Sequence, residues 1–139
     1  MEKSLVLIKP DAMERSLAGA IIARLEKLGL RLVAAKMLHL DKALAQRHYA
    51  VHRDKPFYDS LVGYISSAPI IACVFGGKGV VEVIRKAMGA TDPAEAEKGT
   101  IRGDFGVDIE RNTVHGSDSV ATAEEEIKLF FSQDEIFGY

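Results

Sequence analysis

Two short runs of apolar residues do most to limit the fold of this chain. Residues 5–8 (LVLI) and 70–75 (IIACVF) have the length of β-strands and do not alternate polar with apolar side chains. Continuous apolarity of this kind indicates strands that are covered on both faces, so we expect both runs inside a sheet. Elsewhere the apolar residues recur mostly at helical spacing, which predicts helices packed on that sheet.

The segment between these runs predicts three helical stretches and one further strand. The first helix has Ser16 as its expected N-cap and Gly29 as its stop. A strand follows at about residues 30–40, and Asp41 then caps a short helix that runs to about residue 51. The helical periodicity rests on Leu17, Ile21, Leu25 and Leu28 in the first helix and on Phe57, Leu61 and Ile65 in the third.

The second apolar run leads into a helix that Gly89 ends, a long loop, a short strand and a final helix. Ordered loops of more than about 12–15 residues are uncommon in compact domains unless they have a function, so we expect residues 90–111 to bind a ligand. A strand at residues 113–115 precedes the last helix, where Thr122 and Glu125 have the spacing of a capping box. The two helical faces consist of Val80, Val83, Ile84 and Ala87, and of Ala123, Ile127, Phe130 and Phe131.

The resulting order of elements is β-α-β-(α-α)-β-α-loop-β-α. Without the inserted helical pair, this is the β-α-β-β-α-β pattern of a ferredoxin-like sandwich with one helix added. The predicted fold class is therefore α/β (α+β), with a four-stranded antiparallel sheet covered by helices, an inserted helical pair and a long cleft loop. The chain has 139 residues and no linker or repeat, so we expect residues 1–139 to form one domain.

Charge and cysteine content narrow the expected environment. The formal net charge of −2 gives no general attraction to nucleic acid or acidic membranes, so phosphate binding would need a local group of basic side chains. The single Cys73 cannot form an internal disulfide and lies in an apolar strand, which indicates a buried thiol in a reducing compartment. We expect no signal peptide and no membrane span, and the simplest location is the cytoplasm.

The strongest candidate for chemistry is the stretch at residues 112–119, NTVHGSDS. Histidine has the side-chain pKa nearest neutrality, so His115 can act as an acid, a base, a nucleophile or a ligand. Ser117 lies two residues further on and points to the same side of an extended segment. Glu126 could accept a hydrogen bond from one imidazole nitrogen and leave the other free to attack. The alternatives are a structural histidine and an acid that stabilises a helix N-terminus.

Three basic residues occur where a ligand could reach them. Lys9 ends the first strand, Arg85 lies on a helix, and Arg102 falls in the long loop. Strand ends are where α/β sheets present binding groups, and guanidinium groups bind phosphate oxygens bidentately. If the three side chains converge, they form a clamp for a polyphosphate. Arg85 also fits a solvent-exposed helix face.

Aromatic and glycine-rich segments have simpler interpretations. Tyr49 and Phe57 border the helical insertion, where their periodicity favours the core, although an aromatic residue at a cleft edge can also stack on a base. Residues 76–79 (GGKG) lack the ending and the spacing of a Walker A loop, so we expect a turn there.

Metal binding and hydrolysis are the other chemistries that the residues suggest. His48 and His52 are spaced to share a metal, but no third ligand is placed beside them in the sequence, so we expect no metal site. The set of His115, Ser117 and Asp118 resembles a hydrolase triad. Without a G-x-S-x-G elbow, and with the three so close in sequence, a triad is disfavoured.

Taken together, these motifs resemble those of the nucleoside diphosphate kinase family. The stretch at residues 112–119 is similar to the family's active-site signature, and the resemblance covers nearly the whole chain with family-like spacing. The other similar segments are residues 7–11 (LIKPD), 52–57 (HRDKPF), 89–93 (GATDP) and 99–105 (GTIRGDF).

The resemblance implies a role for each matching residue. His115 would be the nucleophile that is phosphorylated on its imidazole, and Glu126 would orient the ring with help from Tyr49 and Ser117. Lys9 would act both in binding and in catalysis through its charge. The implied nucleotide-binding residues are Lys9, Arg85, Thr91, Arg102 and Asn112 for phosphates and sugar hydroxyls, and Phe57, Leu61 and Ile109 for the base.

The resemblance further implies a ping-pong transfer of the γ-phosphoryl group from a nucleoside triphosphate, typically ATP, to GDP or another diphosphate. Mg²⁺ would travel on the nucleotide phosphates rather than in a protein cage. Broad base specificity is expected because every base has a π-face on which an aromatic ring can stack. A nucleotide-binding regulator without activity is the main alternative, and the intact His115 and Glu126 argue against it.

The chain departs from the family's pattern in the long loop and at its C-terminal residues. Asp92 stands where the family usually has asparagine, and Lys98 replaces a common proline. Residues 136–139 (IFGY) differ from those of many hexameric members. Because the loop makes subunit contacts in this family, we expect a homo-oligomer and leave tetramer and hexamer open.

Overall fold

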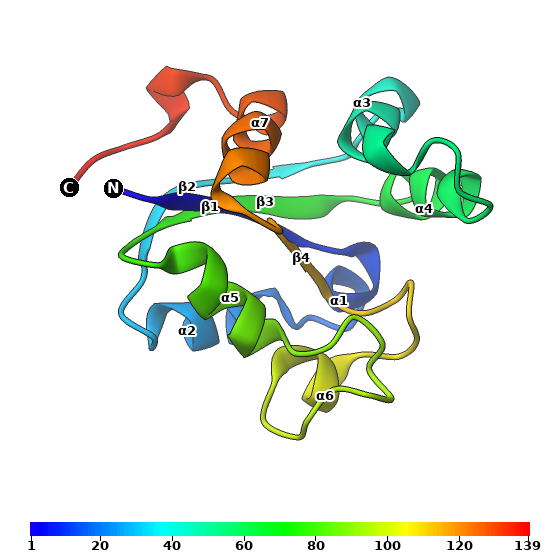
Figure 1. Cartoon of the computed structure of the whole chain (residues 1–139), viewed down its shortest axis with the longest axis horizontal. Coiled ribbons are helices and arrows are strands. Elements are labelled where there is room, and N and C mark those ends of the chain that lie inside the picture. Colours follow the sequence, from blue (N-terminus) through cyan, green and yellow to red (C-terminus); the bar gives the residue numbers. More distant parts are fainter.

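The computed structural model describes residues 1–139 as four strands, seven α-helices and two short 3-10 helices (Figure 1). In chain order these are β1 (Lys3–Ile8), α1 (Pro10–Glu14), α2 (Ala18–Glu26), β2 (Arg31–Leu38), α3 (Lys42–His48), η1 (Ala50–His52), α4 (Tyr58–Ile65), β3 (Ile70–Gly76), α5 (Val80–Met88), α6 (Ile101–Phe105), β4 (Val114–Gly116), α7 (Val120–Phe130) and η2 (Gln133–Glu135).

The strands form one antiparallel sheet in the order β2-β3-β1-β4, which is the strand order of a ferredoxin-like sandwich. The predicted fold class is confirmed. The two strands with continuous apolar sequence, β1 and β3, occupy the centre of the sheet as expected. Short β4 pairs with the end of β1, where Leu7 lies opposite His115. This pairing attaches the candidate nucleophile to a central strand that is almost fully buried.

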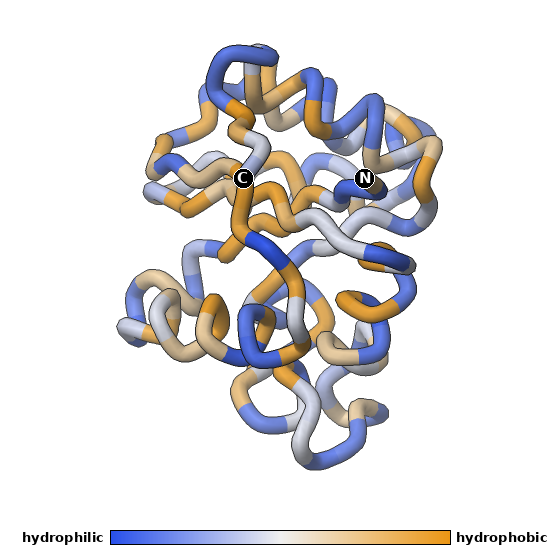
Figure 2. The backbone as a smooth tube through the Cα atoms, turned by 90° about the vertical axis from the view of Figure 1, so that its left-hand side faces the viewer, coloured by the Kyte–Doolittle hydropathy of each residue, from blue (hydrophilic) through white to orange (hydrophobic).

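Alternate residues of β1 contribute to two hydrophobic cores, one on each face of the sheet. Leu5 and Leu7 pack with residues of α3, α4 and α7, whereas Val6 and Ile8 pack with residues of α2 and α5. Figure 1 shows α3 and α7 on one side of the sheet and α2 and α5 on the other. Hydrophobic segments gather along the strands in the middle of the molecule (Figure 2). Cys73 is fully buried in the second core, as predicted.

Two of the predicted helix boundaries are confirmed by their caps. Asp41 accepts a hydrogen bond from the backbone N–H of Leu44 at 2.7 Å at the start of α3. Gly89 ends α5 with a φ of 83°, a left-handed conformation that favours glycine. None of the helices has both the length and the apolar character that crossing a bilayer requires.

Several predictions about the helices are wrong. The N-cap of α2 is Leu17, because Ser16 has a φ of 60° and lies in the turn before it. Helix α7 begins earlier than expected, with Ser119 as its N-cap, so Thr122 is inside the helix. Leu28 follows the end of α2 and is 47% exposed rather than facing the core. The short helix α1 was missed because Pro10 suggested a break, although proline is also favoured at the first helical position.

The predicted long loop at residues 90–111 contains the helix α6. Thr100 caps it by accepting a hydrogen bond from the backbone N–H of Gly103 at 3.1 Å. The strand after the loop starts at Val114 because Thr113 has a φ of 75°, which is strained for a β-branched residue. Asp11 stabilises this conformation by accepting a hydrogen bond from the N–H of Thr113 at 3.1 Å. The chain therefore reaches His115 through a tightly held turn.

Candidate active site

A cleft of about 930 Å³ collects side chains from both layers of the molecule and from the segment between α5 and β4. Its walls include eleven of the residues that the sequence singled out: Lys9, Tyr49, Phe57, Leu61, Arg85, Thr91, Arg102, Ile109, Asn112, His115 and Glu126. Ser117 does not line the cleft and lies fully buried behind it. Residues from almost the whole length of the chain thus meet at one place.

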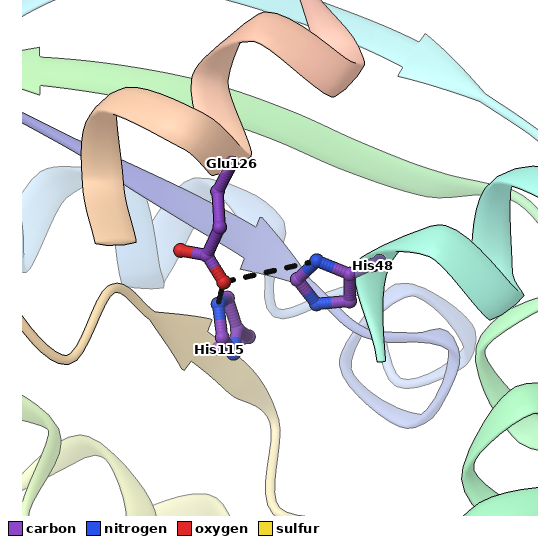
Figure 3. Close-up of side chains that lie close together, drawn as sticks. All are labelled: His48, His115 and Glu126. Carbon is purple, nitrogen blue, oxygen red and sulfur yellow. Dashed lines mark hydrogen bonds and ion pairs between the residues drawn. The ribbon is translucent and has the colours of Figure 1, made fainter. Parts of the chain in front are cut away.

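His115 is held on β4 with its ring directed at Glu126 on α7 (Figure 3). Nε2 of His115 lies 2.9 Å from Oε2 of Glu126. An ionised carboxylate only accepts hydrogen bonds, so Nε2 carries the proton and the neutral ring keeps its lone pair on Nδ1. The side chain is 20% exposed, so a ligand in the cleft can reach the ring. This arrangement is that of an oriented nucleophile.

The carboxylate of Glu126 is itself held in place by Ser117. The hydroxyl of Ser117 donates to Oε1 of Glu126 at 2.7 Å and accepts from the backbone N–H of Leu5 at 3.1 Å. Burial alone would raise the pKa of Glu126, but the hydrogen bonds from His115 and Ser117 hold that pKa below its ordinary value. The carboxylate therefore remains charged beside the imidazole.

His48 is a member of this site that the sequence did not assign. Its ring meets that of His115 edge-on, with centroids 4.6 Å apart and an interplanar angle of 84°. Burial, followed by the nearby His115, lowers the pKa of His48 to about 3, so the ring is neutral at pH 7. Its Nδ1 lies 3.8 Å from Oε2 of Glu126, too far for a hydrogen bond. Spacing suggested His52 as its companion, whereas the fold pairs it with residues far along the chain.

Tyr49 contacts the site through His48. The Tyr49 and His48 rings have centroids 4.6 Å apart, and burial raises the pKa of Tyr49, which keeps the phenol protonated. The structure thus places Tyr49 behind His48 in the wall of the cleft.

Lys9 and Asn112 form the floor beside the histidine. Nζ of Lys9 donates to Oδ1 of Asn112 at 2.8 Å, and the amide of Asn112 donates to the backbone oxygens of Thr91 and Ile109 at 2.8 and 3.0 Å. Burial, with Arg102 as the next cause, lowers the pKa of Lys9 to about 8. The ammonium group is therefore mostly charged at pH 7 but poorly solvated, which favours an anionic ligand.

Two arginines complete the positive lining of the cleft. Arg102 is buried and donates to the backbone oxygens of Val114 and Gly89 at 2.8 and 3.2 Å. Burial and the charge of Arg85 lower the pKa of Arg102 to about 10, so it stays protonated at neutral pH. Arg85 is more exposed and pairs with Asp118 at 2.6 Å. Three cations from separate elements line one cleft, as the polyphosphate hypothesis required.

The cleft also has an apolar part. Phe57 is 46% exposed and Ile109 is 63% exposed, and both line the cleft together with Leu61. Exposed aromatic and aliphatic side chains beside a group of cations suit a ligand with a flat ring at one end and negative charge at the other.

Comparison with known proteins identifies the family. The family model described as nucleoside diphosphate kinase matches residues 2–136. The chain belongs to the nucleoside diphosphate kinase family. It is therefore a phosphotransferase, and the predicted family is confirmed.

Similar family members come from bacteria and archaea. A nucleoside diphosphate kinase of Dehalococcoides mccartyi strain 195 is 57% identical over 139 residues, covering all of this chain and 98% of that protein. One from Archaeoglobus fulgidus is 54% identical and covers all of this chain and 92% of its own length.

Solved structures of family members have the same fold. The halophilic nucleoside diphosphate kinase of Halobacterium salinarum, in complex with CDP, has a TM-score of 0.97 at 46% identity over 99% of this chain and 92% of that one. The Aquifex aeolicus nucleoside diphosphate kinase has a TM-score of 0.96 at 39% identity over 98% of this chain and 99% of that one.

Of the two departures in the loop, Asp92 fits its local structure. Asp92 accepts a hydrogen bond from the backbone N–H of Ala94 at 3.0 Å. An asparagine oxygen could accept the same bond, so the exchange leaves this turn intact. Lys98 lies two residues before Thr100, the N-cap of α6.

Proposed function

We propose that the chain moves the γ-phosphoryl group of a nucleoside triphosphate to a nucleoside diphosphate through a phosphohistidine on His115. The observation that carries this proposal is the hydrogen bond between Nε2 of His115 and Glu126, which leaves Nδ1 with a lone pair beside the cleft. His115 lies on β4, which pairs with the central strand β1, so its position has little freedom. Phosphoryl transfer depends mainly on positioning and charge stabilisation.

In the first half-reaction Nδ1 attacks the γ-phosphorus, the bond between γ-phosphorus and the bridging oxygen breaks, and the diphosphate leaves. The proton stays on Nε2, so the phosphorylated ring carries positive charge that Glu126 balances at 2.9 Å. In the second half-reaction a different diphosphate attacks the phosphorus and restores the neutral ring. Both halves use one site, which predicts ping-pong kinetics.

Lys9, Arg85 and Arg102 supply the charge that the phosphates need. Arg102 is fixed by its two backbone acceptors, whereas Arg85 must share its charge between Asp118 and the ligand. In this proposal Thr91 and Asn112, which also line the cleft, contact the phosphates and the sugar hydroxyl groups.

Mg²⁺ fits as a companion of the nucleotide. Each of the four carboxylates that line the cleft already has a partner: Glu126 pairs with His115, Asp118 with Arg85, Glu110 with Ser60 and Glu125 with Lys128. The one cluster of potential metal ligands is rich in nitrogen, whereas Mg²⁺ prefers oxygen. When bound to the phosphates, Mg²⁺ neutralises part of their charge.

Phe57 stacks on the base in this proposal, with Leu61 and Ile109 on either side. A stacked aromatic ring accepts any base, so we propose broad specificity for purine and pyrimidine nucleotides.

We further propose that the whole chain acts as one domain in a homo-oligomer, tetramer or hexamer, in the cytoplasm. The free, buried Cys73 suits a reducing compartment, and the exposed Met37 lies on the edge strand β2, where a second copy could pack.

A labelling experiment tests the transfer. The protein is incubated with γ-labelled ATP and Mg²⁺, and we expect an acid-labile, base-stable label that moves to GDP when GDP is added. His115→Asn should take up no label, although it should bind nucleotide and retain its circular dichroism spectrum. Full labelling of His115→Asn would contradict the assignment of the nucleophile.

A further inference from the structure

The side chains of His48, His115 and Glu126 come together so that one donor atom from each lies within 4.8 Å of the other two (Figure 3). Oε2 of Glu126 lies between the two rings, 2.9 Å from Nε2 of His115 and 3.8 Å from Nδ1 of His48. Both ring nitrogens of His48 are buried and have no hydrogen-bond partner. Buried polar atoms are normally paired, so this orphaned imidazole points to a ligand that the phosphoryl transfer does not use.

We propose that His48, His115 and Glu126 form a binding site for a transition-metal ion, with Zn²⁺ as the best fit. Two imidazoles and one carboxylate are a donor set that zinc accepts, with a fourth position left for water. In a tetrahedral zinc site the ligand atoms are about 3.3 Å apart. The separations of 2.9 and 3.8 Å from Glu126 to the two histidines bracket this value, whereas the two imidazole nitrogens lie within 4.8 Å of each other and must approach by up to about 1.5 Å.

The three groups differ in how far they are exposed to the cleft, and His48 and Glu126 are both buried. His115 is the partly exposed member, so an ion can enter from the cleft. Mg²⁺ does not compete because it prefers oxygen ligands and keeps much of its water.

Zinc on Nε2 of His115 would switch off the nucleophile. The N–H bond on Nε2 breaks and the proton moves to Nδ1, so the neutral ring keeps one proton but loses the lone pair that attacks phosphorus. The metal also replaces the hydrogen bond to Glu126. This consequence rests on the proposed function, whereas metal binding itself does not. The site would therefore make phosphorylation sensitive to zinc without contact between zinc and the nucleotide.

A titration of the nucleotide-free protein tests the site. Zn²⁺ is added in competition with a chromophoric chelator, and Co²⁺ is used in parallel because its visible absorption reports its coordination. We expect one Zn²⁺ per chain and the intense visible bands of four-coordinate Co²⁺. His48→Phe keeps a ring in the pocket but removes both nitrogens. It should weaken binding by about 100-fold or more, since even indirect partners of a metal ligand contribute about 10–100-fold.

The matched control is His39→Phe, which removes an exposed histidine that contacts Ser66 outside the cleft. It should bind zinc as the wild type does. A wild-type protein that takes up no zinc, or equal loss in both variants, would overturn the proposal. If His48→Phe does not fold, His115→Asn serves as the second test, because zinc binding unchanged in that variant would also overturn it.

Activity separates this site from the proposed function. Labelling by ATP should fall as Zn²⁺ is added and recover when a chelator removes it. A protein that binds zinc stoichiometrically but takes up no label under any condition would contradict the phosphoryl transfer and leave the metal site standing.

Discussion

Ser117 and Glu126 are joined by a hydrogen bond of 2.7 Å that fixes the carboxylate through the oxygen that His115 does not use. The same serine oxygen accepts from the N–H of Leu5 at 3.1 Å, at the centre of the sheet. The orientation of the imidazole is therefore set by β1 as well as by helix α7. Ser117, which the sequence placed on the same side of the chain as His115, acts on the ring through Glu126.

Ser117→Ala should slow the phosphorylation of His115 by about 10- to 100-fold. A hydrogen bond to a charged group contributes about 1.5–3 kcal/mol, and each 1.4 kcal/mol of barrier corresponds to about a factor of ten. The variant should also lose about 1–3 kcal/mol of unfolding free energy, because the buried N–H of Leu5 loses its acceptor. Rapid-quench labelling and urea unfolding measure the two effects.

Ser119→Ala is the matched control. Ser119 caps α7 by accepting from the N–H of Thr122 at 3.1 Å and does not contact Glu126. Its loss should cost about 1 kcal/mol of stability and leave the labelling rate near that of the wild type. Equal rates for the two variants would show that the bond to Glu126 has no influence on transfer.

The sequence contained enough information for the sheet and for most of the cleft. Continuous apolarity placed β1 and β3 in the centre, because only strands covered on both faces have that pattern. The histidine signature and the separated cations identified the charged part of the cleft, whereas the residues expected to hold the sugar and the base were assigned only through the resemblance to the family. The position of His48 could not be predicted from spacing, because its partners His115 and Glu126 reach it only through strand pairing and helix packing. The left-handed backbone conformation of Thr113 could not be predicted either, because the side chain that stabilises it, Asp11, is distant in the sequence.

Gly89→Ala should destabilise the protein and the site together. A Cβ at this position would lie 2.5 Å from Oγ1 of Thr100, and the φ of 83° is unfavourable for alanine. The backbone oxygen of Gly89 also accepts from Arg102, so a shift there disturbs a phosphate-binding cation. We expect a loss of at least about 1 kcal/mol in urea unfolding and a higher KM for nucleotides.

Gly63→Ala applies the same substitution where nothing lies within 4 Å of the new Cβ, inside helix α4. It should raise the unfolding free energy by about 0.5–1 kcal/mol, because alanine favours the helix. A destabilising effect of the same size at both positions would exclude the clash with Thr100 as the cause at Gly89.

The value of kcat/KM for the nucleotide should fall as the pH rises through about 8. Burial and Arg102 lower the pKa of Lys9 to about 8, against the opposing charges of Asp11, Glu110 and Asp108. Deprotonation of Lys9 removes a cation from the free enzyme, which kcat/KM reports. Lys9→Arg keeps its charge over this range, so its profile should lack the inflection near pH 8. The same inflection in that variant would assign it to another group.

Stability should change in the opposite direction over the same range. The pKa of Lys9 is lowered from 10.5 to about 8 on folding, so the unfolded chain binds more protons between these values. Unfolding free energy therefore rises with pH from about 8 to 10.5 in the absence of nucleotide. Urea unfolding at a series of pH values measures this slope, and Lys9→Met, which has no titrating group, should reduce it.

Phe57→Ala should raise KM by a similar factor for ADP, GDP, CDP and UDP. The ring of Phe57 contacts that of His52, with centroids 5.5 Å apart. Because Phe57 is still 46% exposed at the cleft, a base can stack on it. Base stacking contributes about 1–3 kcal/mol, which corresponds to about 5- to 150-fold in affinity. Phe137→Ala removes a ring that is 64% exposed outside the cleft and should leave every KM unchanged. A large effect on one base alone would mean that Phe57 selects that base, because stacking by itself acts on all four.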